Sequence, residues 1–186
     1  MDTTAIPLLG SLRGTVLELG PGAGRSLRHY APDVRWIGVE PDARHRARVR
    51  GEADRLGRGA RVLPGRAERL DLPDASVDAV VATFVLCSVA DQAAALAELV
   101  RVLRPGGRFV FAEHVAARRG TWLRRAQHVW AAFGPCRPDR DTLPAVERAG
   151  LDVVELRSYT RPGPFGAAIP HIAGAALRPA HERKPG

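Results

Sequence analysis

The chain has 186 residues, of which 45% are hydrophobic and 26% are charged; this composition is typical of one globular domain over residues 1–186. Its formal net charge is +8, but the basic residues are dispersed and only 5% of the residues are aromatic, so a nucleic-acid partner is disfavoured. The N-terminal residues lack the pattern of a signal peptide and no apolar stretch is long enough to cross a bilayer, which predicts a cytoplasmic protein without a membrane anchor.

A predicted strand over residues 15–19 leads into a turn that contains Gly20, Gly22 and Gly24. Glycines at alternate positions let the backbone turn sharply and approach a ligand closely. The turn is expected to deliver the N-terminus of a helix over residues 24–30, whose free N–H groups suit an anionic group. Arg25 stands where a dinucleotide fingerprint needs Gly or Ala, and the Gly-Lys-Ser/Thr ending of a phosphate-binding loop is missing. The turn therefore predicts a small-molecule site of another kind.

A second predicted strand, over residues 34–39, ends at Glu40 and Pro41. A carboxylate at this strand tip is placed to accept hydrogen bonds from both ribose hydroxyls of an adenosine ligand. Alternatively, Glu40 is an acid at the start of the helix predicted over residues 42–56, because Pro41 and Asp42 open that helix.

Two more strands are predicted over residues 60–64 and 77–83. In open α/β sheets ligands bind beyond the carboxyl ends of the strands, so the residues at the tip of the second of these strands are candidates to lie beside a reacting group. They are Thr83, Phe84, Leu86 and Cys87. The alternative for Leu86 and Cys87 is the core, since a free Cys is most often a small buried hydrophobe.

The rest of the chain continues the alternation of helices and strands. An amphipathic helix over residues 91–103 is followed by a Pro-Gly-Gly turn into a strand over residues 108–113. Further elements are predicted over residues 139–149 (helix), 151–159 (strand) and 168–176 (last strand). Trp122, Trp130 and Phe133 recur at helical spacing and form an apolar stripe, which faces either the core or an acceptor site.

The two cysteines lie far apart in the sequence, and the six histidines are scattered. Neither set follows the spacing of metal ligands, so the sequence predicts no metal site. In the predicted compartment Cys87 and Cys136 are expected to be reduced thiols.

The turn and its preceding acid, Glu18-x-Gly20-x-Gly22-x-Gly24, resemble the first motif of the class I S-adenosylmethionine-dependent methyltransferases, in the methyltransferase type 11 domain. The resemblance implies a doubly wound, Rossmann-like α/β fold in three layers (α/β/α), with a seven-stranded sheet whose last strand is antiparallel. It also implies S-adenosyl-L-methionine as the cofactor. Arg66 stands where the family often has Asp, and Glu68 is either an adenine contact or merely solvated. The implied cofactor-binding residues are Glu18, Gly20, Gly22, Gly24, Glu40, Pro41, Ala67, Glu68, Thr83 and Phe84.

Several further segments are similar to the alkyl thiol S-methyltransferases, over most of the chain from Val16 to Ala176. Animal members of that family begin with a hydrophobic membrane anchor, which this sequence lacks. The resemblance implies a small-molecule thiol acceptor, with His114 and then His171 as candidate bases, each equally interpretable as an orienting or structural residue. The similar segments are Val85–Val89, Glu113–Ala117, Thr121-Trp122, Gly134–Cys136 and Pro170–Gly174. The candidate substrate contacts are Leu86, Cys87, Trp122 and Cys136.

Three functions are compatible with these observations. The first is S-methylation of a small thiol, which needs only weak help from a base because a thiol with a pKa of about 8.5 is partly ionised at neutral pH. The second is O- or N-methylation in a bacterial secondary-metabolite pathway, since one fold serves many substrates. The third is a cofactor-binding protein without turnover.

Overall fold

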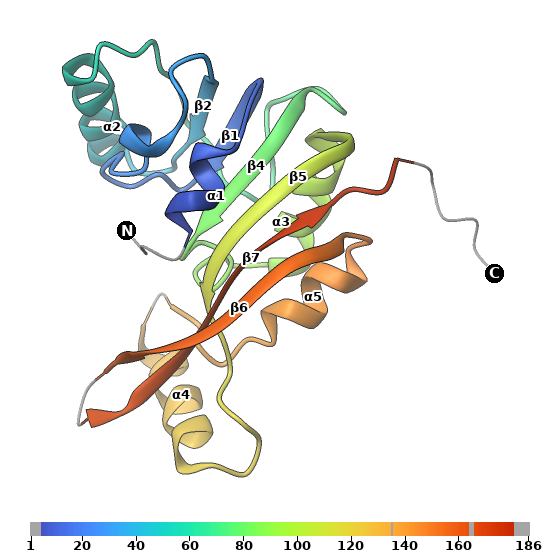
Figure 1. Ribbon diagram of the computed structural model, residues 1–186. Coiled ribbons are helices and arrows are strands. Elements are labelled where there is room, and N and C mark those ends of the chain that lie inside the picture. Colours follow the sequence, from blue (N-terminus) through green and yellow to red (C-terminus); the bar gives the residue numbers. More distant parts are fainter. Residues whose placement is uncertain (1–4, 135, 164–165, 181–186) are drawn as a thin grey trace.

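The computed structural model describes residues 5–134, 136–163 and 166–180 (Figure 1). Its centre is a seven-stranded sheet in the order β3-β2-β1-β4-β5-β7-β6. Only β7 runs antiparallel to its neighbours, β5 and β6. This confirms the predicted sheet, including its antiparallel last strand. The strands are β1 (Thr15–Leu19), β2 (Arg35–Val39), β3 (Arg61–Leu63), β4 (Val77–Thr83), β5 (Leu103–His114), β6 (Asp152–Pro162) and β7 (Ala168–Leu177).

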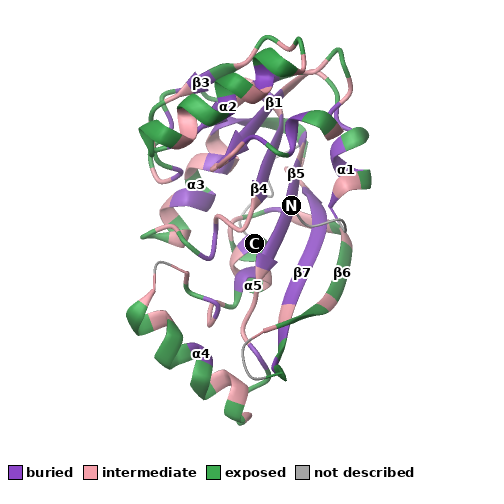
Figure 2. Cartoon of the chain, turned by 90° about the vertical axis from the view of Figure 1, so that its left-hand side faces the viewer, coloured by how far each residue is buried: buried purple, intermediate pink, exposed green. Residues whose placement is uncertain are grey.

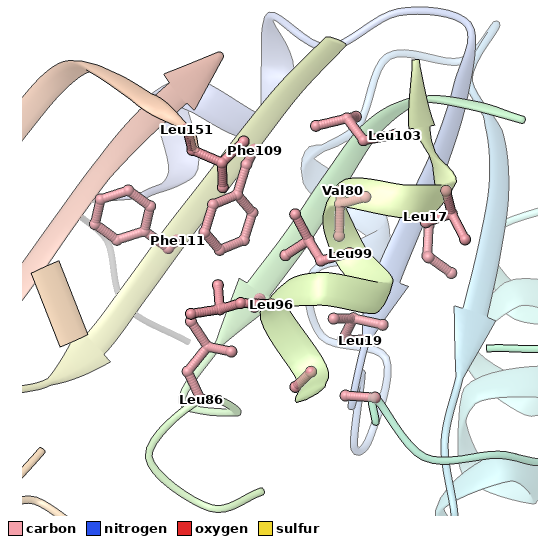
Figure 3. Close-up of a cluster of buried hydrophobic side chains, with 14 of the residues drawn as sticks. Leu17, Leu19, Val80, Leu86, Leu96, Leu99, Leu103, Phe109, Phe111 and Leu151 are labelled. Carbon is pink, nitrogen blue, oxygen red and sulfur yellow. The ribbon is translucent and has the colours of Figure 1, made fainter. Parts of the chain in front are cut away.

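Helices cover both faces of the sheet. Successive residues of a strand point to opposite faces, and accordingly Val16 packs with α1 and α2, whereas Leu17 packs with α3 and α5. The second of these clusters includes Leu99, Phe109 and Phe111, all fully buried (Figure 3). The predicted three-layer arrangement is therefore confirmed. The helices are α1 (Ile6–Gly10), η1 (Leu27–His29), α2 (Ala43–Arg55), α3 (Gln92–Val102), α4 (Trp122–Phe133) and α5 (Thr142–Arg148).

The prediction of a helix over residues 24–30 is wrong. Only the short 3-10 turn η1 forms there, because Gly20, Gly22 and Gly24 all have positive φ (56°, 56° and 74°) and keep the chain irregular. The glycine turn therefore presents no helix N-terminus to a ligand. The Pro-Gly-Gly segment also differs from the prediction: α3 ends at Val102 as expected, but β5 begins at Leu103 and includes the segment.

The apolar stripe on α4 does not face the core, and its aromatic side chains are largely exposed. Trp122 is 67% exposed and Phe133 is 88% exposed, and Gln127 is the buried residue of this helix. Most of α4 is accordingly coloured as exposed in Figure 2. The Gln127 amide holds the helix to the chain after β5, because it accepts from the backbone N–H of Ala117 (2.7 Å) and donates to the carbonyl of Val115 (3.0 Å). Among the described residues, no helix has both the length and the hydrophobicity of a membrane span.

Glu98 and Arg101, on α3, hold the loop that follows β3. Arg101 donates to the carbonyls of Leu70 (2.9 Å) and Leu72 (2.8 Å), and Glu98 accepts from Arg101 and from the backbone N–H of Leu70 (2.7 Å). The Arg101 guanidinium lowers the pKa of Glu98 below its ordinary value of 4.5. The ionised pair thus stabilises the fold above that pH, and the contribution disappears as the pH falls through the folded-state pKa.

We therefore expect Glu98→Gln to lower the thermal midpoint near neutral pH by about 2–4 °C, the shift for ~1 kcal/mol in a chain of this size. The difference from wild type should shrink as the pH is lowered below about 4. Thermal unfolding followed by circular dichroism across this range measures it. A difference that is independent of pH would contradict the assigned ion pair.

Candidate functional site

Glu18 fixes the start of the glycine turn from inside the protein. Its Oε2 atom accepts from Ser26 Oγ (2.7 Å), Tyr30 Oη (2.9 Å) and Trp36 Nε1 (3.0 Å), and the side chain is buried. Burial raises the pKa of Glu18 above its ordinary value, although the three donors oppose this effect. Glu18 also lines the turn cavity, the space that it shares with Thr83, Phe84 and the glycine turn.

A second and larger space, the main cavity, opens between the glycine turn and the tip of β2. Its volume is about 360 Å³, within the range of small-molecule sites. Gly22 borders this cavity at a φ of +56°, and a Cβ atom built there would meet no protein atom within 4 Å. The backbone therefore leaves room where any other residue would project into the open space.

Glu40 closes the same edge of the main cavity. The carboxylate accepts from the backbone N–H of Gly22 at Oε2 (3.2 Å) and from that of Asp42 at Oε1 (3.0 Å), and the residue is 5% exposed. Asp42, not Glu40, caps α2 by accepting from the backbone N–H of His45. A carboxylate has about four accepting positions; the two N–H groups take two of them, and His45 Nδ1 lies 3.7 Å from Oε1.

The opposite side of the main cavity belongs to the segment after β3. Glu68 Oε1 accepts from the backbone N–H of Ala90 (2.7 Å) and thereby joins this segment to the chain after β4. Glu68 therefore has a structural hydrogen bond as well as a place on the cavity wall. Arg66 and Ala67 line the cavity beside it.

Most of the predicted cofactor-binding residues border one of these two cavities. Gly24 borders neither: a Cβ there would come within 3.3 Å of Leu27 and of the Val49 backbone, so this glycine allows close packing against α2. The residues on the main cavity are Gly20, Gly22, Glu40, Pro41, Ala67, Glu68 and Phe84, and those on the turn cavity are Glu18, Gly20, Thr83 and Phe84. The sequence analysis missed His45, Ser88 and Ala90 as lining residues.

Phe84 lies where three cavities meet. It borders the main cavity, the turn cavity and a third space, the histidine cavity, which His114, Trp130, Arg161 and His171 also line. Its φ is +57°, an uncommon conformation for a bulky residue that often accompanies functional sites. The Phe84 backbone N–H donates to the carbonyl of Ala112 (2.8 Å), which holds this turn against β5.

Beside Phe84, two thiols and an imidazole converge. The Sγ atoms of Cys87 and Cys136 each lie 3.5 Å from His114 Nδ1. The hydrogen bond with Cys136, together with burial, raises the pKa of the Cys87 thiol to about 12. The same contact lowers the pKa of Cys136. We refer to Cys87, His114 and Cys136 as the thiol–imidazole cluster.

Glu113 shapes the loop that carries Cys87. Its Oε1 atom accepts from the backbone N–H groups of Val85 and Leu86 (2.9 Å each), and Oε2 accepts from that of Cys87 (3.1 Å). Burial raises the pKa of Glu113 well above its ordinary value. In the sequence, Glu113 is visible only as an acid at the end of the apolar strand over residues 109–113, and no separate role was predicted for it.

His171 completes the imidazole side of the histidine cavity. It is buried, its Nδ1 bonds the carbonyl of Ile169 (2.8 Å), and its ring stacks on Tyr159 with centroids 5.3 Å apart. The ring of His114 lies 4.6 Å away. The pairing of β5 with β7, which sets His114 opposite His171, brings the two predicted histidines together.

Two of the predicted substrate contacts, Leu86 and Trp122, do not line the histidine cavity. Leu86 is fully buried in the core beneath α3 (Figure 3), since the Glu113 hydrogen bonds turn its side chain inward. Trp122 borders a separate, shallow hollow near Arg118 and Pro170. Trp130, from the same stripe, lines the histidine cavity instead.

The main and turn cavities fit the adenosyl ligand that the sequence resemblance implies. Gly22 leaves open the space that a Cβ would fill, and Glu40 presents carboxylate oxygens with accepting positions to spare. At the other end Phe84 separates this region from the thiol–imidazole cluster. The arrangement can bind a nucleoside at one end and a second small molecule beyond Phe84.

Comparison with known proteins agrees with this geometry. Residues 17–111 match the model of a methyltransferase domain family. Thiol S-methyltransferase TMT1A from Homo sapiens is 36% identical over 172 residues, which cover 88% of this chain and 70% of that protein. Thiol S-methyltransferase TMT1B from Homo sapiens is 34% identical over 173 residues, with the same two coverages of 88% and 70%.

A solved structure supports the fold independently. A SAM-dependent methyltransferase from Methanosarcina mazei superposes with a TM-score of 0.76 at 16% identity, over 97% of this chain and 99% of that one. The family match, the relatives and this neighbour together identify S-adenosylmethionine as the cofactor. The chain therefore belongs to the S-adenosylmethionine-dependent methyltransferase family.

Proposed function

We propose that this protein transfers a methyl group from S-adenosylmethionine to the sulfur of a small thiol. The observation that carries the proposal is the 36% identity, over 88% of the chain, to a protein named as a thiol S-methyltransferase. The thiol–imidazole cluster supports it, because a soft, partly apolar site beside Phe84 suits a small sulfur compound better than a highly hydrated polymer.

In this proposal the cavities divide the binding tasks. Glu40 accepts the ribose hydroxyls, and the segment with Ala67 and Glu68 contacts the adenine. The turn cavity, with Glu18 and Thr83, receives the methionine part. When bound, S-adenosylmethionine supplies a methyl group on a positively charged sulfur, ready for an in-line nucleophile.

The acceptor enters the histidine cavity, whose volume is about 380 Å³. In this placement Phe84 and Trp130 pack against its apolar part, and His114 links the cavity to the sulfur atoms of Cys87 and Cys136. Alignment of the two reactants is the main contribution of such a site, worth roughly 7–11 kcal/mol of the barrier. The roles of His114 and His171 as bases stay predictions.

The experiment uses three acceptors that differ in the reacting atom alone: benzenethiol, phenol and aniline. The reductant is a phosphine, because thiol reductants would themselves be acceptors. At neutral pH a simple thiol is about 30-fold more ionised than a phenol, so we expect the thioether to form at least about 30-fold faster than the ether. Methylation of oxygen or nitrogen without any thioether would overturn the proposal, as would the absence of all three products.

A further inference from the structure

The thiol–imidazole cluster has the dimensions of a metal site. His114 Nδ1 lies 3.5 Å from each sulfur, and the three atoms all lie within 4.8 Å of one another. Tetrahedral zinc has Zn–S distances of about 2.3 Å and Zn–N distances of about 2.0 Å, which place sulfur and nitrogen ligands about 3.5 Å apart. The two observed sulfur–nitrogen distances therefore already match the edges of a zinc tetrahedron.

We propose that Cys87, His114 and Cys136 bind a zinc ion with three protein ligands, and that the fourth position receives the sulfur of the acceptor. The inference rests on the proposed thiol methylation and specifies how the thiol is held and activated. Two cysteines and one histidine with an open position form a known type of catalytic zinc ligand set. Soft thiolate ligands also favour zinc over magnesium or calcium.

The protein holds the three ligands in place without a metal. Glu113 fixes the loop of Cys87 through three backbone N–H groups. Arg140 donates to the carbonyl of Val89 (2.7 Å), and the backbone N–H of Arg137 donates to that of Cys87 (2.6 Å), so the segment that carries Cys136 is joined to the same loop. Because the three side chains are already ordered, less conformational entropy is lost when an ion binds, and this favours binding.

The cluster reaches the histidine cavity through His114, the member that lines it. Cys136 is half-buried and His114 lines the histidine cavity together with Phe84, whereas Cys87 is buried behind them. An acceptor thiol that enters the fourth position releases its proton to solvent. Its sulfur lone pair then forms the new bond to the methyl carbon while the sulfonium–methyl bond breaks, which gives a thioether, S-adenosylhomocysteine and one proton.

Metal binding is tested on the full chain without the cofactor. Protein that has been stripped with a chelator is titrated with Zn²⁺ against a competing chelator, and with Co²⁺, whose visible absorption reports tetrahedral sulfur coordination. The variants are His114→Gln and Cys136→Ser, since Cys136 is half-buried and its replacement spares the core. His128→Gln is the control, because that imidazole pairs with Asp139 outside the cluster.

We expect one zinc per chain in wild type and in His128→Gln. Zinc affinity should fall by more than about 100-fold in each cluster variant. The loss of a residue that only orients a metal ligand typically lowers the affinity by about 10- to 100-fold. A small thiol added to the Co²⁺ protein should change its absorption. Equal zinc affinity in wild type and Cys136→Ser, or the absence of bound metal, would overturn the proposal.

Activity then separates this inference from the function on which it rests. If the metal-free protein methylates benzenethiol as fast as the zinc-loaded protein, the zinc proposal fails while thiol methylation stands, and His114 remains a candidate base. If the protein binds zinc but the zinc-loaded protein methylates no thiol, the proposed function fails. The proposed role of zinc in thiol methylation then fails as well. We expect zinc removal to lower the thioether rate at least tenfold and its restoration to recover it.

Discussion

Replacing Gly22 with Ala is expected to abolish tight cofactor binding while the protein still folds. The new methyl group meets no protein atom within 4 Å, and because Gly22 lines the main cavity we expect the methyl group to occupy space that the adenosyl ligand needs. We expect the affinity for S-adenosylhomocysteine to fall by about 100-fold, which corresponds to ~3 kcal/mol of steric misfit. Isothermal titration calorimetry measures this change.

A matched variant separates the loss of space from backbone strain. Gly57 has a φ of +63°, close to the +56° of Gly22, and a Cβ there also meets nothing within 4 Å, but it lies outside the cavities described above. Both alanine variants should lose a similar amount of stability, about 1–2 kcal/mol, because both place an L-residue in the left-handed region. Cofactor affinity should fall in Gly22→Ala alone; an equal fall in both variants would refute the steric explanation.

Glu40→Gln is the second change for which we expect a large effect on binding. The carboxylate is nearly buried, accepts two backbone N–H groups and lines the main cavity, where we propose that it also accepts the ribose hydroxyls. Hydrogen bonds to a charged group contribute roughly 1.5–3 kcal/mol. We therefore expect the dissociation constant for S-adenosylhomocysteine to rise about 10- to 150-fold.

The control for Glu40→Gln is Glu147→Gln, which removes the same charge from an exposed position on α5. Its cofactor affinity should equal that of wild type. Adenosine with the 2′- or 3′-hydroxyl removed gives a second check, since Glu40→Gln should bind the deoxy ligands no worse than wild type does. A Glu40→Gln protein with unchanged affinity for S-adenosylhomocysteine would contradict the proposed ribose contact.

The cofactor side could be predicted from the sequence because its signals are local. The apolar run of β1 ends directly at Gly20, and the next parallel strand ends at Glu40, so the topology of the sheet alone brings the two together. The same local pattern misled for the helix over residues 24–30. Gly20, Gly22 and Gly24 all have positive φ, which prevents a regular helix there. The sequence does not show how many of these glycines adopt that conformation.

The acceptor side depends on contacts between distant segments, which is why the sequence predicted it less well. Cys87, His114 and Cys136 come from the loop after β4, the end of β5 and the chain beyond α4, and no spacing rule joins them. Leu86 and Cys87 are neighbours, yet Glu113 sends one into the core and leaves the other at the site. The stripe on α4 was recognised, but Trp130 and not Trp122 reaches the histidine cavity.

The fold by itself does not identify the acceptor. Specificity therefore resides in the residues at the strand tips. In this chain we propose that they are the residues around Phe84 and the thiol–imidazole cluster.

We propose that the glycine turn and Glu40 together form the cradle that binds the adenosyl cofactor. Calorimetric titration of the purified chain with S-adenosylhomocysteine tests it most directly. We expect one binding site per chain, competition with S-adenosylmethionine, and loss of binding in Gly22→Ala but not in Gly57→Ala. A wild-type chain that shows no heat of binding and no protection from thermal unfolding at saturating ligand would contradict it.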